Sequence, residues 1–185
     1  MPRLFTGFEI PPEIAFDLSL MRGGMSGARW IEPENFHITI RFMGDVDHGM
    51  ARDIFSSLGG IRRSPCEITI DGLSTFGGDK PRALIARVQP TSQLIDLQGE
   101  QERLVRRLGL APEPRKYAPH VTLARLRGTS SSDVAQYLGG RGLFTSLKFT
   151  ARRFVLYSAR DSVGGGPYVV EAAYPLGGAD IQPPA

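Results

Sequence analysis

Two histidine-threonine pairs stand in the sequence, each inside a short stretch of alternating apolar residues. His37 and Thr39 lie in "NFHITIRF", and His120 and Thr122 lie in "YAPHVTLAR". Successive side chains of a β-strand point to opposite faces, so each histidine shares a face with its threonine while aliphatic residues pack behind it. One such pair is common by chance, but two copies use two of the 3 histidines of the chain. We therefore interpret the repeat as functional.

Two imidazoles that face each other across a cleft suit general acid-base catalysis. An unperturbed histidine has a pKa of about 6.5, so one ring can accept a proton while the other, charged, donates one. The threonine hydroxyls add neutral hydrogen-bond donors, and the whole set favours a tetrahedral oxyanion such as phosphate. The remaining histidine, His48, begins a predicted helix and has no comparable setting, so we expect it at the surface.

Metal chemistry and nucleophilic catalysis have weaker support in the sequence. Zinc usually takes three or four ligands from Cys, His, Asp or Glu, and no carboxylate shares the face of either histidine. The single cysteine, Cys66, begins another apolar alternation and is interpreted as a core residue. The chain has neither a GxSxG motif nor a glycine-rich phosphate loop. We expect no metal and no other cofactor.

Three residues near the motifs could contact a phosphorylated ligand. Arg41 follows the first histidine by four positions, so strict alternation places it on the histidine face; an exposed charge at the strand end is the alternative. Arg125 follows the second histidine by five positions and has the wrong parity unless the strand bulges or ends there. A guanidinium can bind phosphate oxygens in a bidentate manner. Tyr117 could stack on a nucleobase or pack in the core, whereas core packing is expected for Phe36.

The pattern of apolar residues and turns predicts an α+β fold with mostly antiparallel sheets. Besides the two motif strands, strands are expected at residues 3–10, 29–31, 66–76, 82–88, 143–160 and 167–176, and helices at residues 11–23, 47–58, 91–110 and 130–138. This order does not repeat the strand-helix unit of a parallel Rossmann sheet. Each half of the chain surrounds its motif with strands and a helix, as a duplicated lobe would. A pseudo-two-fold axis would then bring the motif strands face to face.

Length and composition are those of an ordinary globular protein. We predict that residues 1–178 form one bilobal domain and that residues 179–185 form a flexible tail. One cysteine excludes an internal disulfide and favours a reducing compartment. Because no apolar stretch approaches a membrane span and the first residues do not resemble a leader peptide, we expect a cytoplasmic protein. The net charge of +3 and the pI near 9.3 favour an anionic partner.

The two motifs resemble the paired HxTx signatures of the two-histidine (2H) phosphoesterases. The segments "RLFTGFEIP", "ARWIEPENFHITIRFMGDV", "ITIDGLSTF", "PRALIARV", "FVLYSA" and "YVVEAAYPL" are similar to the bacterial and archaeal RNA 2',3'-cyclic phosphodiesterases, also called 2'-5' RNA ligases. This resemblance extends to about Leu176 and implies a bilobal, LigT-like α+β fold with outer helices, a central cleft and no required metal. The chain departs from the family pattern at Leu84-Ile85, where an aromatic residue is frequent, and at Phe36, where leucine is common.

The resemblance also implies roles for individual residues. His37 would be the general acid, His120 the general base, Thr39 and Thr122 would hold phosphate oxygens, and Arg125 would match the arginine that follows the second motif. The implied activity is hydrolysis of RNA 2',3'-cyclic phosphate ends, on tRNA fragments or short oligonucleotides, to 2'-phosphomonoesters. We expect a monomer without a membrane partner. Two alternatives stay open: 2'-5' ligation in the same site, and a non-catalytic module that binds RNA ends.

Overall fold

A single antiparallel sheet forms the centre of the molecule in the computed structural model, which describes residues 1–141, 143–159 and 166–177. Its strands are β1 (Arg3–Glu9), β2 (Ala28–Trp30), β3 (His37–Asp45), β4 (Cys66–Phe76), β5 (Ala83–Val88), β6 (His120–Leu126), β7 (Leu147–Ala151), β8 (Arg153–Ala159) and β9 (Tyr168–Pro175). The helices of the described residues are α1 (Pro12–Ser19), α2 (His48–Leu58), α3 (Ser92–Arg107) and α4 (Ser131–Gly139), with a 3-10 helix η1 (Pro33–Asn35). The predicted α+β class is confirmed, and the predicted tail falls outside the described residues.

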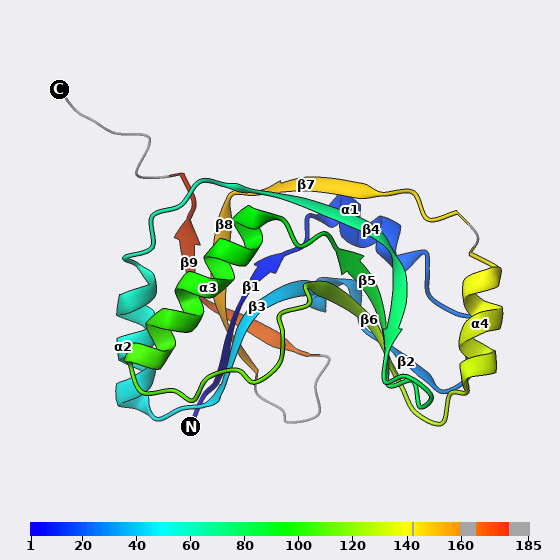
Figure 1. Ribbon diagram of the computed structural model, residues 1–185, viewed down its shortest axis with the longest axis horizontal. Helices are drawn as coiled ribbons and strands as arrows, with labels where there is room; N and C mark the ends of the chain where they lie inside the picture. The colour runs from blue at the N-terminus through cyan, green and yellow to red at the C-terminus, as the bar shows by residue number, and fades with distance from the viewer. Residues whose placement is uncertain (142, 160–165, 178–185) are drawn as a thin grey trace.

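The two motif strands lie side by side in the middle of the sheet. The strand order is β7-β4-β5-β6-β3-β1-β8-β9, and β2 pairs with β6. Figure 1 shows the sheet as an arch whose two halves meet where β3 and β6 run next to each other. One antiparallel pair, Ile38 with Val121, joins these strands in the described residues, and both side chains are fully buried. Each half of the sheet therefore contributes one motif at the junction.

The two lobes do not coincide with the two halves of the chain. β5 belongs to the first half of the sequence but pairs with β6, whereas β8 belongs to the second half and pairs with β1. The first half thus gives β4 and β5 to the lobe of the second motif, and the second half gives β8 and β9 to the lobe of the first motif. The prediction of two lobes is confirmed. The prediction that each half of the chain surrounds its own motif is wrong, because each half of the chain gives strands to the other lobe.

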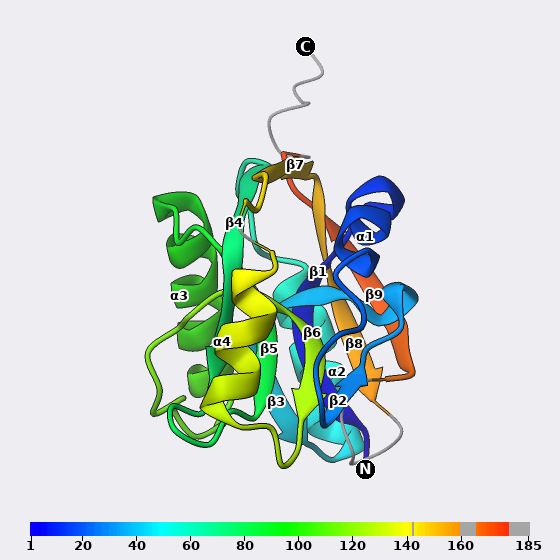
Figure 2. The ribbon, with the colours of Figure 1, turned by 90° about the vertical axis from the view of Figure 1, so that its right-hand side faces the viewer.

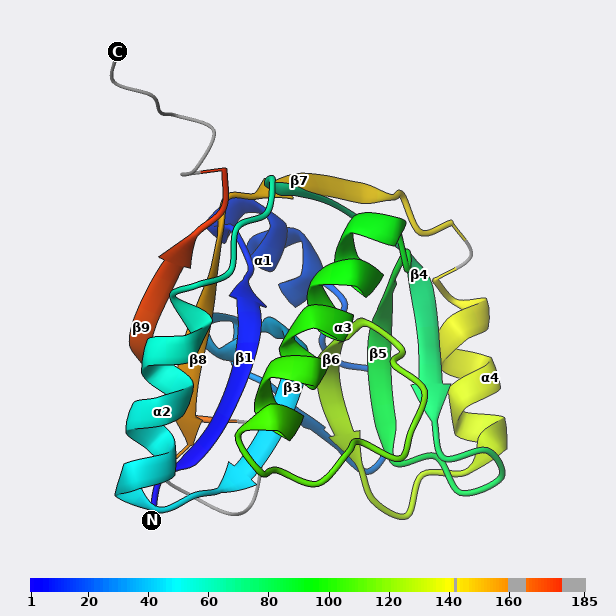
Figure 3. The ribbon, with the colours of Figure 1, turned by 60° about the vertical axis from the view of Figure 1, so that its left-hand side comes forward.

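The helices lie on both sides of the sheet and extend its core. α3 lies beside α2 and packs against β3 and β4, while Figures 2 and 3 show α1 on the opposite side of the sheet. α3 begins where the side chain of Thr91 accepts a hydrogen bond from the Leu94 N–H, and it buries Leu94, Leu97, Leu104 and Val105. No helix in the described part of the chain is both long and apolar enough to span a membrane.

Both motif strands contain an irregularity at the same distance from the histidine. β1 pairs consecutive residues with Thr39 and Arg41, and β5 pairs consecutive residues with Thr122 and Ala124, so each motif strand holds one extra residue in between. Such a β-bulge reverses the alternation of faces beyond it. The two strands consequently share one burial pattern: the residues one, three and four positions after the histidine are buried and the fifth is exposed.

Candidate active site

The two HxTx motifs converge on one cavity. Because β3 and β6 are antiparallel and Ile38 faces Val121, continuing the register places each histidine across from the threonine of the other motif. His37, Thr39, His120 and Thr122 all line the same cavity of about 610 Å³. The alternation that buries the aliphatic residue between histidine and threonine therefore presents both polar residues on the cavity side.

Backbone carbonyl groups fix the orientation of both imidazole rings. His37 Nδ1 lies 3.0 Å from the Asn35 carbonyl oxygen, and His120 Nδ1 lies 2.7 Å from the Ala118 carbonyl oxygen. A carbonyl oxygen can only accept a hydrogen bond, so Nδ1 carries the hydrogen in each ring. In a neutral imidazole, Nε2 is then the basic nitrogen. We assign this tautomer to both histidines.

The His37 ring is the more enclosed of the two. Three aromatic rings surround it at centroid distances of 5.0, 5.6 and 4.9 Å, those of Phe5, Tyr157 and Tyr168. Its Nε2 lies 3.0 Å from Thr39 Oγ1, so the hydroxyl can donate to it. Burial lowers the pKa of His37 to about 4, and the nearby positive charges of His120 and Arg125 act in the same direction. The ring is therefore neutral near pH 7 in the free protein.

His120 lies in a more open setting. The Phe76 ring packs edge-on against it at 4.7 Å, and the hydrogen bond to Ala118 is exposed. Burial lowers the pKa of His120 below its usual value, and the charge of Arg125 lowers it further. A neutral Nε2 with access to solvent can accept a proton from water.

Arginine side chains supply the charge of the cavity. Four of them line it, and its described lining residues include neither Asp nor Glu; the four are Arg3, Arg82, Arg115 and Arg125. Arg125 lies on the histidine face because the bulge in β6 supplies the extra residue that its parity required. Arg3 also forms an ion pair with Asp45 at 3.2 Å. A cavity of this composition attracts phosphate groups.

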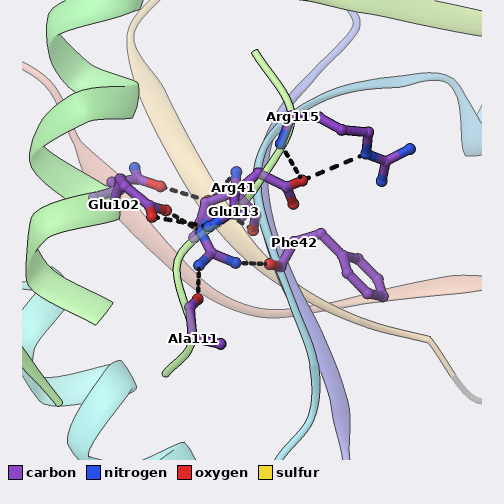
Figure 4. Close-up of polar contacts among 8 residues, drawn as sticks. Arg41, Phe42, Glu102, Ala111, Glu113 and Arg115 are labelled. Carbon is purple, nitrogen blue, oxygen red and sulfur yellow. Dashed lines mark hydrogen bonds and ion pairs between the residues drawn. The ribbon is translucent and has the colours of Figure 1, made fainter. Parts of the chain in front are cut away.

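Arg41 is turned inward and does not line the catalytic cavity. The bulge in β3 turns it inward, where it is 5% exposed, forms an ion pair with Glu102 and donates hydrogen bonds to the carbonyl oxygens of Phe42 and Ala111, the latter at 2.7 Å (Figure 4). The prediction that Arg41 shares the histidine face is therefore wrong, because one extra residue breaks the strict alternation on which it rested. Its burial also excludes the alternative of an exposed charge at the strand end, whereas a contact of Arg41 with phosphate stays a prediction.

Tyr117 holds the first motif strand from outside the cavity. Its hydroxyl donates a hydrogen bond to the Thr39 carbonyl oxygen at 2.8 Å, and its ring packs against the hydrophobic core. Burial raises the pKa of Tyr117, so the hydroxyl stays a neutral donor. Phe36 is buried in the core, as expected. Cys66 is also buried, and burial raises the pKa of its thiol to about 11.

Three cationic residues of the cavity were not found by sequence reasoning. Arg3, Arg82 and Arg115 come from a strand start, a turn and a loop, which carry no common motif. The pairing of Ala83 with Arg125 brings Arg82 close to the second motif, but that pairing depends on the strand order. Within the described ranges, no group of three or more His, Cys, Asp or Glu side chains could hold a metal ion.

Solved structures share the fold. The crystal structure of E. coli LigT complexed with 3'-AMP aligns with a TM-score of 0.75 and 22% identity, covering 95% of this chain and 99% of that chain. The crystal structure of TT0787 of Thermus thermophilus aligns with a TM-score of 0.77 and 18% identity, covering 94% of this chain and 97% of that chain. At these identities the likeness establishes the fold.

Curated relatives carry the name RNA 2',3'-cyclic phosphodiesterase. The Aeropyrum pernix protein is 39% identical over 100 residues, which are 53% of this chain and 57% of the relative. The Aquifex aeolicus protein is 28% identical over 188 residues, covering 95% of this chain and 98% of the relative. The model of the LigT like Phosphoesterase family matches twice, at residues 8–86 and 85–168, and each match contains one HxTx motif. On these matches, which together span most of the sequence, the chain belongs to the LigT-like phosphoesterase family.

Proposed function

We propose that this protein hydrolyses RNA 2',3'-cyclic phosphate ends to 2'-phosphomonoesters by metal-independent two-histidine catalysis. The observation that carries this proposal is the convergence of two imidazoles, with equivalent tautomers, on one cavity lined by arginines. A cyclic phosphodiester needs a base on one side of phosphorus and an acid on the other. The names of the curated relatives support the same reaction.

We infer an in-line displacement. His120 Nε2 takes a proton from water as the water oxygen attacks phosphorus, and His37 protonates the departing 3' oxygen, which leaves the phosphate on the 2' oxygen. Negative charge builds on the five-coordinate phosphorus during this step. Arg125 and the hydroxyls of Thr39 and Thr122 stabilise that charge, because charged and neutral donors fixed around a developing oxyanion lower the barrier.

Substrate binding prepares His37 to act as the acid. In the free protein its ring is neutral, because burial and nearby cations lower its pKa. A phosphate anion in the cavity offsets the nearby cations and favours the charged form of the imidazole, which raises the pKa again. We expect the protein to take up a proton together with the substrate. His120, in the more open position, then stays neutral and serves as the base.

The proposed substrate is RNA, acted on by a single chain. A 2',3'-cyclic phosphate requires the 2' oxygen of ribose, so DNA ends cannot form it. One chain supplies both histidines and Arg125, so the site is complete in a monomer. Candidate substrates are tRNA fragments and short oligonucleotides whose ends carry the cyclic phosphate.

Turnover of an oligonucleotide with a 2',3'-cyclic phosphate end, in the presence of EDTA, tests the proposal. We expect a 2'-phosphomonoester as the only product by ³¹P NMR, with one oxygen from H₂¹⁸O on its phosphate. Binding without turnover would instead favour a module that recognises RNA ends. A 3'-phosphate product would show that the 2' oxygen departs and would overturn the assigned position of the acid beside the 3' oxygen. Joined strands in the presence of 5'-hydroxyl RNA would show ligation.

A further inference from the structure

A second hollow continues from the catalytic cavity along the loop that precedes β6. Its volume is about 280 Å³, and it shares Thr39, Phe42, Phe76 and His120 with the catalytic cavity. Its charged lining residues are four cations, Arg41, Arg82, Arg115 and Lys116, and one carboxylate, Glu113. Arg82 and Arg115 also line the catalytic cavity, whereas Lys116 lines the second hollow but not the catalytic cavity. The two spaces therefore form one continuous surface with cations on both sides of the boundary.

Another hollow that adjoins the catalytic cavity is lined by carboxylates instead of cations, one of them, Glu9, in an ion pair with Arg153. It shares Asn35 and Tyr168 with the catalytic cavity and is bordered by Glu9 and Glu34. No Lys or Arg of the described chain lines it. An RNA strand repels carboxylates and attracts guanidinium and ammonium groups. The charges thus direct an RNA strand out of the catalytic cavity toward Arg115 and Lys116.

The cationic wall is held by the buried contacts of Arg41. Arg41 donates to the Ala111 carbonyl oxygen at 2.7 Å, and its ion-pair partner Glu102 accepts a hydrogen bond from the Glu113 N–H at 3.1 Å. Glu113 in turn accepts from the backbone N–H of Arg115 at 3.2 Å and from its side chain at 3.4 Å (Figure 4). These hydrogen bonds and the ion pair attach the loop to α3, and the Arg115 side chain is 79% exposed. An exposed cation on an anchored loop is positioned to meet a ligand.

Resting on the proposed function, we infer that the second hollow binds the penultimate nucleotide of the RNA. The 3',5'-phosphodiester that joins it to the terminal nucleotide contacts Arg115 and Lys116, with Arg82 at the boundary. The exposed Phe42 ring, 48% accessible, and the half-buried Phe76 ring border the space for its sugar and base. Base-aromatic contacts tolerate any base, so this contact selects for chain length rather than sequence.

The test compares a mononucleotide with a dinucleotide that ends in the same cyclic phosphate. Adenosine 2',3'-cyclic phosphate fills the catalytic cavity alone, whereas ApA with a 2',3'-cyclic phosphate end also reaches the second hollow. We expect the wild-type kcat/KM to be at least about tenfold higher for the dinucleotide, since charge-assisted phosphate contacts have about that effect. ApA whose linkage is an uncharged methylphosphonate should lose most of that advantage with the unmodified protein.

Variants of the cationic wall sharpen the test. Lys116→Ala and Arg115→Ala should each lower the ratio of dinucleotide to mononucleotide kcat/KM by about threefold to tenfold. The matched control is Arg106→Ala, an exposed arginine of α3 that lines neither hollow and should leave the ratio unchanged. For the methylphosphonate substrate, the ratio of its kcat/KM to that of the mononucleotide should be insensitive to both wall variants, because its linkage lacks the charge that they contact. The ratio is the readout because Arg115 also lines the catalytic cavity, where the cyclic phosphate of every substrate binds.

The outcomes separate the inference from the proposed function. Equal kcat/KM values for the two substrates, or a ratio that neither variant lowers, would overturn the second subsite and leave the proposed function standing. A methylphosphonate substrate that keeps the full advantage would also overturn it. If neither substrate is turned over, the proposed function fails and the inference fails with it.

Discussion

The strands β3 and β6 have the same backbone plan and different chemistry. Both begin with a histidine whose Nδ1–H is held by a carbonyl two residues earlier, and both bulge after the threonine. Four positions after the histidine, β3 buries Arg41 and β6 buries Ala124. At the fifth position, β3 presents Phe42 to the cavity and β6 presents Arg125. The pseudo-symmetric scaffold therefore carries an apolar side and a cationic side.

This difference shows how one repeated motif can serve two roles in a single displacement. Aromatic rings enclose His37, whereas His120 is more open and lies on the strand that presents Arg125. Burial disfavours the charged form of an imidazole until an anion binds beside it, whereas an exposed imidazole can exchange protons with water. In the proposed mechanism, one lobe supplies the acid and the other supplies the base, because the surroundings of the two identical motifs differ.

Removal of either histidine should have the largest effect. His37→Ala and His120→Ala should each lower kcat on a cyclic-phosphate oligonucleotide by about 10³-fold or more, because general acid-base catalysis contributes about 10²- to 10⁴-fold per group. The double variant should lose little more than one single variant, since the pair acts as a unit. His48→Ala, on the surface of α2, is the control and should keep wild-type activity. A single variant within tenfold of wild type would contradict the acid-base pair.

The buried arginine of β3 should matter for folding more than any exposed ion pair. Glu102→Gln leaves the Arg41 guanidinium without its buried carboxylate, and breaking such a pair lowers the free energy of unfolding by about 3 kcal/mol. The matched control is Glu9→Gln, which breaks the exposed pair with Arg153 and should cost less than about 1 kcal/mol. Urea denaturation measures both values. Equal losses of unfolding free energy in the two variants would show that the buried pair of Arg41 with Glu102 stabilises the fold no more than an exposed ion pair.

The fifth position of each motif strand offers a direct comparison of charge with aromatic contact. Arg125→Ala should lower kcat/KM by about 10²-fold, because it removes a cation from the developing phosphorane charge. Arg125→Lys should recover part of that loss, since lysine keeps the charge but not the bidentate geometry. Phe42→Ala, at the equivalent position, should cost no more than about tenfold, the scale of one base-aromatic contact. A larger effect at Phe42 than at Arg125 would reverse the assignment of the cationic side.

The pH optimum of kcat/KM should lie on the acid side of neutrality. The proposed step needs His37 protonated and His120 neutral, and in the free protein the pKa of His37 is about 4 and that of His120 is below its usual value. Above the His120 pKa, the fraction of protein with His37 protonated falls with each unit of pH. The kcat/KM should therefore peak below about pH 6.5 and fall about tenfold per pH unit beyond it.

The profile of kcat alone should peak at higher pH than that of kcat/KM. It reports the complex with substrate, in which the bound phosphate raises the pKa of His37. Rates measured at saturating and limiting substrate, from about pH 4.5 to about pH 8.5, give both profiles, with thermal unfolding monitored at each pH as a control. A kcat/KM that stays constant between about pH 5 and 8 would exclude the proposed protonation states.

Local patterns predicted most elements and the shared face of each histidine-threonine pair. Alternation of apolar residues placed His37 and Thr39 correctly because no irregularity lies between them. It misplaced Arg41 because a β-bulge depends on the partner strand, which local sequence does not contain. For the same reason the sequence did not decide which face Arg125 occupies, because that face depends on the bulge in β6.

Long-range pairing was the part that sequence reasoning could not supply. The pairings of β5 with β6 and of β8 with β1 join residues that lie far apart in the sequence, which local patterns do not report. The cationic residues Arg82 and Arg115 reach the cavity only through that arrangement and through the contacts of Arg41 with the loop before β6. Their positions follow from tertiary packing rather than from a motif.

The central claim is that two imidazoles with the same tautomer act on one phosphate, and ¹⁵N NMR of the histidine rings tests it most directly. Above neutral pH, the free protein should show protonated Nδ1 and unprotonated Nε2 in both His37 and His120. Saturation with adenosine 2'-phosphate should then protonate Nε2 of His37 and shift Nε2 of His120 in the same titration. An Nε2–H tautomer in either free ring, or a titration in which one ring does not respond, would contradict the account.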